Sequence, residues 1–195
     1  MPSGFDALST EETPGDKMAT RPCKCGHAGL GRGYCGKAPR CQQAYQSKVS
    51  GPLMDRIDLV VEMPAVSAAD MTLPSAAEGS AEVAARVARG RDLQAERARE
   101  AGDGASPLNA RASGAWLDTI AALDAPAKAL LAKAAEAGAL TARGWSRTLR
   151  LARTIADLEG APSVRRVHIA EALIYRRIGP AVEGVGDQRA GAYRM

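Results

Sequence analysis

The chain has 195 residues, a formal net charge of +4 and few large aromatic side chains, with one Phe, two Trp and four Tyr. Alanine is abundant; because it favours helices but buries little area, the composition predicts a closely packed helical core and argues against a sheet-rich one. No run approaches the roughly 20 apolar residues of a membrane span, and the N-terminus has no basic segment followed by an apolar one. These features predict a cytoplasmic protein with neither a membrane span nor a signal peptide.

The N-terminal part of the sequence combines a polar leader with a cysteine-rich region. Residues 1–17 are polar without periodicity and are predicted to be disordered. The region 18–64 contains the pattern C-x-C-x9-C-x5-C, with His27 close by. Its members are Cys23, Cys25, Cys35 and Cys41. Since zinc takes four thiolate or imidazole ligands in a tetrahedron, the pattern predicts a zinc site, structural because four thiolates leave no open position. Free thiols in a loop are the alternative.

A glycine-rich stretch, residues 31–38, imitates the G-x4-G-K pattern of a phosphate-binding loop. Ala38 stands where Ser or Thr must bind Mg²⁺, and Cys35 inside the stretch is a predicted zinc ligand. We therefore reject it. No other stretch resembles a Walker A loop, and no apolar strand ends in Asp-Glu as a Walker B motif would.

The segment SGPLMDRIDLVVEMP, from Ser50 to Pro64, follows the cysteines. Its first half suits a short helix. Ile57–Met63 is an apolar, β-branched run of strand length that Pro64 ends, so it predicts a strand. Residues 65–79 are predicted to be a linker.

Five helices are predicted in the remainder of the chain, from cap residues and helical periodicity. They are Ser80–Glu100, Ser113–Leu123, Asp124–Ala137, Thr141–Gly160 and Ser163–Ile178. Together they make residues 80–178 a helical domain, and residues 179–195 are predicted to be a flexible tail.

Thr141–Gly160 has the most informative helical pattern. Its apolar residues gather on one arc at 100° per residue: Trp145, Leu149, Ala152, Ile155 and Ala156. Three arginines lie on the opposite side: Arg143, Arg147 and Arg150. This side is either a solvated basic face or a surface from which at least one forked, permanently charged guanidinium reaches a phosphate. In the last helix we expect Val167, Ala170, Leu173 and Ile174 to face inward.

Several motifs resemble a known family in the same order along the chain. SGPLMDRIDLVVEMP resembles the segment of AAA+ ATPases in which a helix ends in an arginine just before a strand. More narrowly, CKCG, RCQQAYQSKVSGPLMDRIDL, GSAEVAARVARGRDLQAER, LNAR and HIAEALIYRR resemble the magnesium-chelatase-like YifB/ComM family, over about Thr20 to Arg177. The resemblance implies a mainly α fold: a helical AAA+ lid bundle of about four helices, preceded by a cysteine-rich loop and one orphaned strand of an incomplete AAA+ α/β core.

The resemblance also implies roles for two arginines. Arg56 matches the arginine finger, which reaches the γ-phosphate held by a neighbouring subunit; the alternative is a surface arginine paired with Asp55 or Asp58. Arg143 matches the sensor-2 arginine at the start of a lid helix, which contacts nucleotide in its own subunit. Arg147 and Arg150 are expected to line that face or to form salt bridges.

Some positions depart from the family or lack an assignable role. Arg21 stands where the family has the sensor-1 Asn, and a guanidinium cannot accept a hydrogen bond as that amide does. Asn109-Ala110-Arg111 matches a family motif, with a helix-entry turn as the alternative interpretation.

The family implies a hexamer of AAA+ subunits that uses ATP and Mg²⁺ and acts on DNA in natural transformation and recombination. Because Walker A and Walker B patterns are missing, we expect the C-terminal piece of such an ATPase, without autonomous activity. Two alternatives remain open. One is a small zinc-containing nucleic-acid-binding module that uses the arginines of residues 86–99 and 143–153. The other is a partner subunit that lends Arg56 in trans.

Overall fold

The structure is a computed structural model. It describes residues 23–25, 35–37, 39–54, 56–63, 66, 70–74, 78–102, 105–137 and 140–176. The predictions for the leader, the tail, Arg21 and His27 lie outside these residues. The chain divides between Ser50 and Gly51 into two compact units, here called the N-terminal unit and the helical domain.

The N-terminal unit carries the four cysteines and one short helix, α1 (Arg40–Gln46). The helix begins directly after the turn at Gly36 and Lys37, where the Cys41 N–H donates to the Lys37 carbonyl at 2.9 Å. Cys41 therefore sits in the first turn of α1 while the other three cysteines come from the preceding loop.

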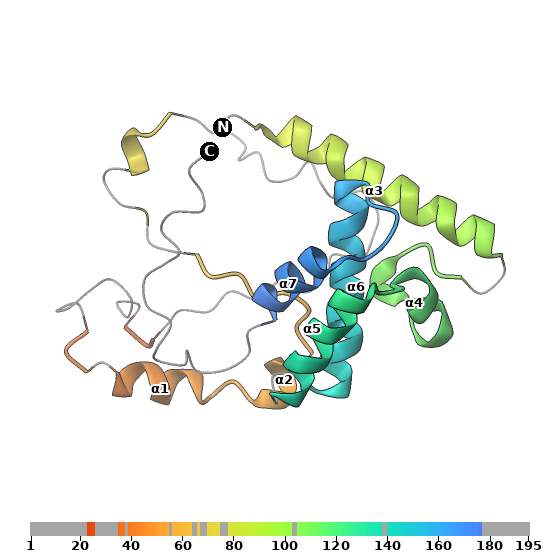
Figure 1. The fold of residues 1–195 in the computed structure, drawn as a ribbon. Coiled ribbons are helices and arrows are strands. Elements are labelled where there is room, and N and C mark those ends of the chain that lie inside the picture. The colour runs from red at the N-terminus through yellow and green to blue at the C-terminus, as the bar shows by residue number, and fades with distance from the viewer. Residues whose placement is uncertain are drawn as a thin grey trace. The chain divides into compact units, whose positions relative to one another are not determined.

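The helical domain contains six α-helices and two short 3₁₀ helices among its described residues (Figure 1). They are α2 (Gly51–Met54), η2 (Asp70–Thr72), α3 (Ser80–Ala101), η3 (Asn109–Arg111), α4 (Gly114–Ile120), α5 (Ala125–Glu136), α6 (Ala142–Glu159) and α7 (Arg166–Tyr175). The five helices predicted from the sequence are thus present, within a few residues of their expected ends. The mainly α fold is confirmed. No described helix is long and apolar enough to cross a membrane.

Side-chain caps explain why α5 and α6 begin where the sequence indicates. Asp124 accepts a hydrogen bond from the Ala127 N–H at 2.7 Å, and the Thr141 hydroxyl accepts one from the Gly144 N–H at 3.0 Å. Each cap satisfies a backbone donor that has no partner within its helix. Gly160 ends α6 in the left-handed region, at φ +75°, where a residue with a Cβ would be strained.

Helix α6 is the centre of the helical domain and contacts α3, η3, α4 and α7 (Figure 1). The predicted apolar arc of α6 is confirmed: Leu149, Ala152 and Ala156 are buried, and Trp145 and Ile155 pack against the core. Many of the buried core residues are alanines, as the composition predicts.

Helix α7 turns a partly different face to the core from the one predicted, although Leu173 packs against the core as expected. Val167 and Ile174 are 56% and 47% exposed, whereas His168, Ile169 and Ala172 are buried. Both sets satisfy helical periodicity, so the period alone could not choose between them. His168 lies inside, where both of its ring nitrogens have hydrogen-bond partners.

The predicted strand at Ile57–Met63 is an extended segment that belongs to no sheet within the described ranges. Its Val60 N–H donates to the Tyr175 carbonyl at the end of α7, at 2.9 Å. Leu59, Val61 and Met63 are exposed. A strand requires a neighbouring strand to satisfy its backbone groups, and the described part of this chain supplies none.

Candidate functional site

Four arginines follow one another along α6, and three of them are held by the domain itself. Arg147 forms an ion pair with Asp58, and Arg150 Nε donates to the Ala112 carbonyl at 2.7 Å. Arg153 is buried and pairs with Asp157. Arg143, in the first turn, is exposed and makes no side-chain hydrogen bond or ion pair with the described residues. The expected salt-bridging role of Arg147 is thereby confirmed.

Arg56 lies just after α2, in surroundings similar to those of Arg143. It is exposed, its backbone N–H donates to the Leu53 carbonyl at 3.0 Å, and its side chain has no polar partner in the described part of the chain. Asp58, one of the two carboxylates that could have neutralised it, pairs with Arg147 instead. The other, Asp55, lies outside the described residues.

Contacts from α6 and from the end of α7 hold the segment that follows Arg56. The ion pair between Arg147 and Asp58 joins α6 to the extended segment that follows Arg56. Arg176, directly after α7, donates to the Ile57 carbonyl of the same segment. The segment is therefore fixed to the helices at three points, Ile57, Asp58 and Val60.

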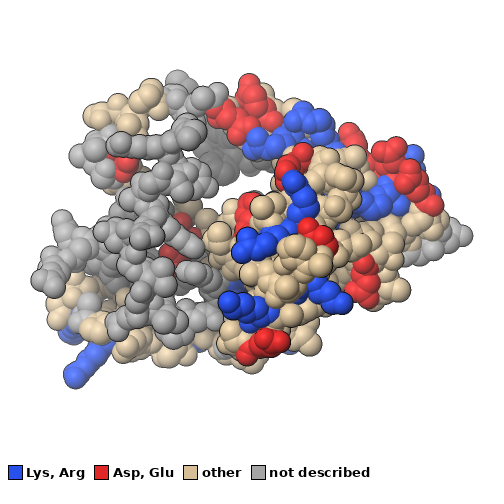
Figure 2. All heavy atoms as spheres, viewed as in Figure 1, with Lys and Arg blue, Asp and Glu red and all other residues tan. Residues whose placement is uncertain are grey.

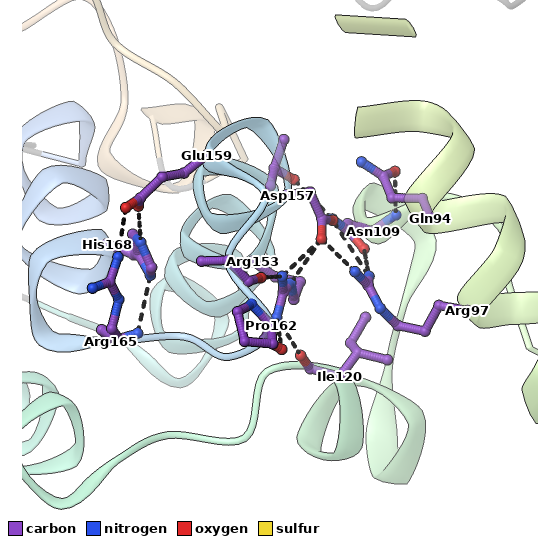
Figure 3. A network of polar contacts seen from close by, with 12 residues as sticks. Gln94, Arg97, Asn109, Ile120, Arg153, Asp157, Glu159, Pro162, Arg165 and His168 are labelled. Atoms are coloured by element: carbon purple, nitrogen blue, oxygen red, sulfur yellow. Dashed lines mark hydrogen bonds and ion pairs between the residues drawn. The ribbon is translucent and has the colours of Figure 1, made fainter. Parts of the chain in front are cut away.

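A buried polar network holds α3, η3 and α6 together (Figure 3). Asp157 lies at its centre, with a side chain that is fully buried. Its carboxylate accepts hydrogen bonds from Arg153 Nη2 at 2.8 Å and from Asn109 Nδ2 at 2.7 Å, and it pairs with Arg97 of α3. Gln94 completes the network by accepting the Asn109 N–H at 3.3 Å. A carboxylate with so many charged and amide donors is well compensated for its removal from water.

Arg153 also donates hydrogen bonds to backbone carbonyls. Nη2 donates to Ala161 at 2.6 Å and Nη1 to Pro162 at 3.1 Å, at the turn that follows α6. Burial lowers the pKa of Arg153 from its usual value, and Asp157 acts in the opposite direction. These contacts use the planar fork of the guanidinium, which a lysine ammonium could not reproduce.

A second polar cluster fixes the start of α7 (Figure 3). His168 Nδ1 accepts the Arg165 N–H at 3.0 Å, and its Nε2 lies 2.5 Å from Glu159 Oε2. Glu159 also pairs with the Arg165 side chain. The hydrogen bond from His168 lowers the pKa of the Glu159 carboxyl, with the Arg165 hydrogen bond as the next contribution.

The LNAR motif, which sequence reasoning left without a chemical role, has a structural one. Residues Asn109–Arg111 form η3, a turn shortly before α4, so the helix-entry interpretation agrees with the structure. The side chain of Asn109 is buried and joins the network around Asp157. Sequence reasoning missed Arg97, Arg153 and Asp157. Only the i, i+4 spacing of Arg153 and Asp157 was visible in the sequence.

The four cysteines converge in the N-terminal unit. Their Sγ atoms all lie within 4.8 Å of one another, with Cys23 to Cys25 at 3.0 Å and Cys25 to Cys35 at 3.4 Å. None of these four cysteines forms a disulfide, and Cys23 is fully buried. Four thiolates around a tetrahedral Zn²⁺ at about 2.3 Å stand roughly 3.8 Å apart, which lies within the range of the observed separations, so the donor set fits this metal.

Comparison with known proteins agrees with the architecture. Residues 77–176, just over half of the chain, match the family described as magnesium chelatase, subunit ChlI C-terminal. Residues 17–71 match the family described as magnesium chelatase, subunit ChlI.

Three relatives illustrate the extent of the similarity. An uncharacterized protein of Mycobacterium tuberculosis is 37% identical over 164 residues, which cover 83% of this chain and 31% of the relative. The uncharacterized protein YifB of Salmonella typhimurium is 33% identical over 165 residues, 82% of this chain and 30% of its own. The competence protein ComM of Haemophilus influenzae is 32% identical over 140 residues, 71% and 26% respectively. The chain thus spans less than a third of the length of these relatives.

The helical domain, preceded in the sequence by a cysteine cluster, defines the class: a lid-like helical domain of the magnesium chelatase type. The chain belongs to the magnesium-chelatase-like family that contains the ComM and YifB proteins.

Proposed function

We propose that this chain supplies the lid and the arginine finger of a hexameric, magnesium-chelatase-like AAA+ ATPase that acts on DNA. The observation that carries the proposal is the contrast along α6. Arg147, Arg150 and Arg153 are engaged within the domain, while Arg143 at the helix start is exposed and has no polar partner among the described residues. An exposed guanidinium that no described residue engages is available for the phosphates of a nucleotide.

Arg143 and Arg56 have different tasks in this proposal. Arg143 contacts the nucleotide in its own subunit, and Arg56 donates to the γ-phosphate bound by the neighbouring subunit. Both act by stabilising the negative charge that spreads over the phosphoryl oxygens as the bond to the leaving group breaks. Mg²⁺ and the backbone donors around the β- and γ-phosphates belong to Walker motifs that this sequence does not contain, so that part of the site comes from other segments of the ATPase.

Arg143→Ala is the direct test of the lid assignment. In a chimera that carries this chain in place of the matching segment of the Haemophilus influenzae ComM protein, we expect the substitution to lower the ATPase rate by about a hundredfold, because one donor to developing charge is lost. Arg166→Ala on α7 removes another exposed arginine and should leave the rate unchanged. Equal rates for Arg143→Ala and the unsubstituted chimera would refute the lid role. The chain alone is the background control and should not hydrolyse ATP.

We further propose that Cys23, Cys25, Cys35 and Cys41 bind one structural Zn²⁺. The proposal is supported by four convergent thiols in one loop-rich unit, a set that satisfies zinc without an open position for chemistry. When bound, the metal would hold the loop and the first turn of α1 together.

Elemental analysis of the purified full chain tests the metal site. We expect about one zinc per chain, and loss of most of it in Cys41→Ser, because three remaining thiolates bind less tightly. Ser47→Ala, directly after the end of α1, is a control that should keep the metal. A preparation without zinc, even after refolding in its presence, would contradict the proposal.

The structure gives less support to a nucleic-acid-binding module based on the arginines of α6. Arg147 and Arg150 hold the domain together, so they are not available as a basic surface. The face of the helical domain visible in Figure 2 also intersperses acidic with basic side chains. A partner subunit that lends Arg56 in trans remains the alternative, and the exposed position of Arg56 suits it equally well.

A further inference from the structure

A surface hollow of about 670 Å³ lies in the N-terminal unit, beside the cysteine cluster. It is lined by Lys24, Lys37, Arg40 and Lys48, together with Tyr45 and the zinc-site candidate Cys41. A cavity of this size is within the range of pockets that hold a small ligand. None of the residues named here takes part in the proposed nucleotide chemistry.

The charge in this hollow is of one sign. The four cations are all the Lys and Arg residues among the described residues of the N-terminal unit, and that part of the unit contains no Asp or Glu. Four thiolates with one Zn²⁺ would carry a net charge of about −2, which offsets only half of the four positive charges. The hollow therefore remains positive even with the metal bound. The helical domain differs, because its face in Figure 2 mixes both signs.

The cationic side chains are available to an external ligand. Lys37, Arg40 and Lys48 are exposed, and their side chains make no hydrogen bond or ion pair with residues that the structure describes. Four cations held near one another without a carboxylate repel each other and favour a polyanion. Phosphates of a nucleic-acid strand provide such charge at regular spacing.

Tyr45 indicates which kind of polyanion fits the hollow. It is a half-buried aromatic ring on α1 and lines the same hollow as the four cations. A positively charged groove combined with an aromatic ring is the arrangement with which proteins hold single strands, since an unstacked base packs on the ring while cations contact the backbone. A base inside a duplex does not offer its face to such a ring.

We propose that this hollow binds a single-stranded nucleic acid, with one base against Tyr45 and the adjoining phosphates among Lys37, Arg40 and Lys48. The inference goes beyond the proposed ATPase function, in which only Arg56 and Arg143 act. It places the contact with the nucleic-acid strand in the N-terminal unit.

The test measures fluorescence anisotropy of a labelled oligothymidine with the zinc-loaded full chain, over a range of salt concentrations. We expect the double substitution Lys37→Ala/Lys48→Ala to weaken binding and to reduce the salt dependence of log K by about 1.4, at roughly 0.7 for each lost single-strand phosphate contact. Lys128→Ala/Lys133→Ala, which removes two exposed lysines of α5, is the matched control and should change neither quantity.

A second pair of variants separates stacking from charge. Tyr45→Ala should weaken oligonucleotide binding by about tenfold with an unchanged salt slope, and Tyr45→Phe should restore it, because the ring alone stacks. Zinc content, measured for every variant, distinguishes a lost contact from a lost fold.

Three results would overturn the inference. One is wild-type affinity and salt slope in the double lysine variant at full zinc content. Another is equal affinity for a duplex of the same sequence. The third is binding of free ATP, but not of the oligonucleotide, through the same lysines. None of these results bears on the ATPase chimera, so the inference can fail while the proposed function stands.

Discussion

Asp157→Ala is expected to lower the free energy of unfolding of the chain by about 3–5 kcal/mol, since it leaves a buried guanidinium without its counter-charge. Arg153 is 2% exposed and has Asp157 as its ion-pair partner among the described residues. The same substitution removes the acceptor of the Asn109 side chain and of Arg97, so α3, η3 and α6 lose their common contact. Urea unfolding followed by circular dichroism measures the change.

Two further variants control this result. Glu171→Ala removes an exposed carboxylate from α7 and should change the free energy of unfolding by no more than about 0.5 kcal/mol. Arg97→Ala should be milder than Asp157→Ala, because the Arg97 side chain is 24% exposed and water can replace part of its contact. A loss below about 1 kcal/mol for Asp157→Ala would show that the network is not what joins these helices.

Arg56→Ala is expected to lower the ATPase rate of the ComM chimera by about a thousandfold or more, the scale of an arginine finger in phosphoryl transfer. The side chain is exposed, so its removal should leave the fold and the free energy of unfolding nearly unchanged. Arg111→Ala, an exposed arginine at the end of η3, serves as the matched control. A rate equal to that of the control would contradict the finger assignment.

Mixed assemblies can tell whether Arg56 acts on a neighbouring subunit. Chimeras with Arg56→Ala would be combined with chimeras that keep Arg56 but have a substituted P-loop lysine. If the finger reaches across the interface, activity should reappear in the mixture although neither preparation is active alone. Mixtures that stay inactive would place the action of Arg56 within its own subunit.

The sequence allowed the helices to be located because their signals are local. Asp124 and Thr141 each cap a helix within three residues, and Gly160 stops α6 through its own backbone preference. The apolar arc of α6 was correct because its hydrophobic residues recur at helical spacing on one side, although Thr148, Arg153 and Asp157 beside them are buried as well. Helix α7 was different, since a buried histidine with two hydrogen-bond partners shifts the inward face by about one residue.

The polar interior could not be predicted in the same way. Arg97 and Asp157 are 60 residues apart, and Arg153 lies at the edge of the apolar arc, where an arginine would ordinarily reach solvent. Nothing local marks an arginine as buried, because burial depends on carbonyls at the turn after α6 and on a carboxylate one turn further along. The convergence of the cysteines, by contrast, was predictable, since the four lie within a short, glycine-rich stretch.

The ion pair between Arg147 and Asp58 has a mechanical consequence. Arg147 is one helical turn beyond Arg143, and Asp58 is two residues beyond Arg56, so this contact couples α6 directly to the segment that carries Arg56. A tilt of α6 that follows movement at Arg143 must either pull the segment of Arg56 with it or break this contact. The ion pair thus links α6 directly to the segment of Arg56, whose arginine faces a different subunit in the proposed ring, and Arg147→Met would weaken this coupling while leaving Arg143 and Arg56 in place.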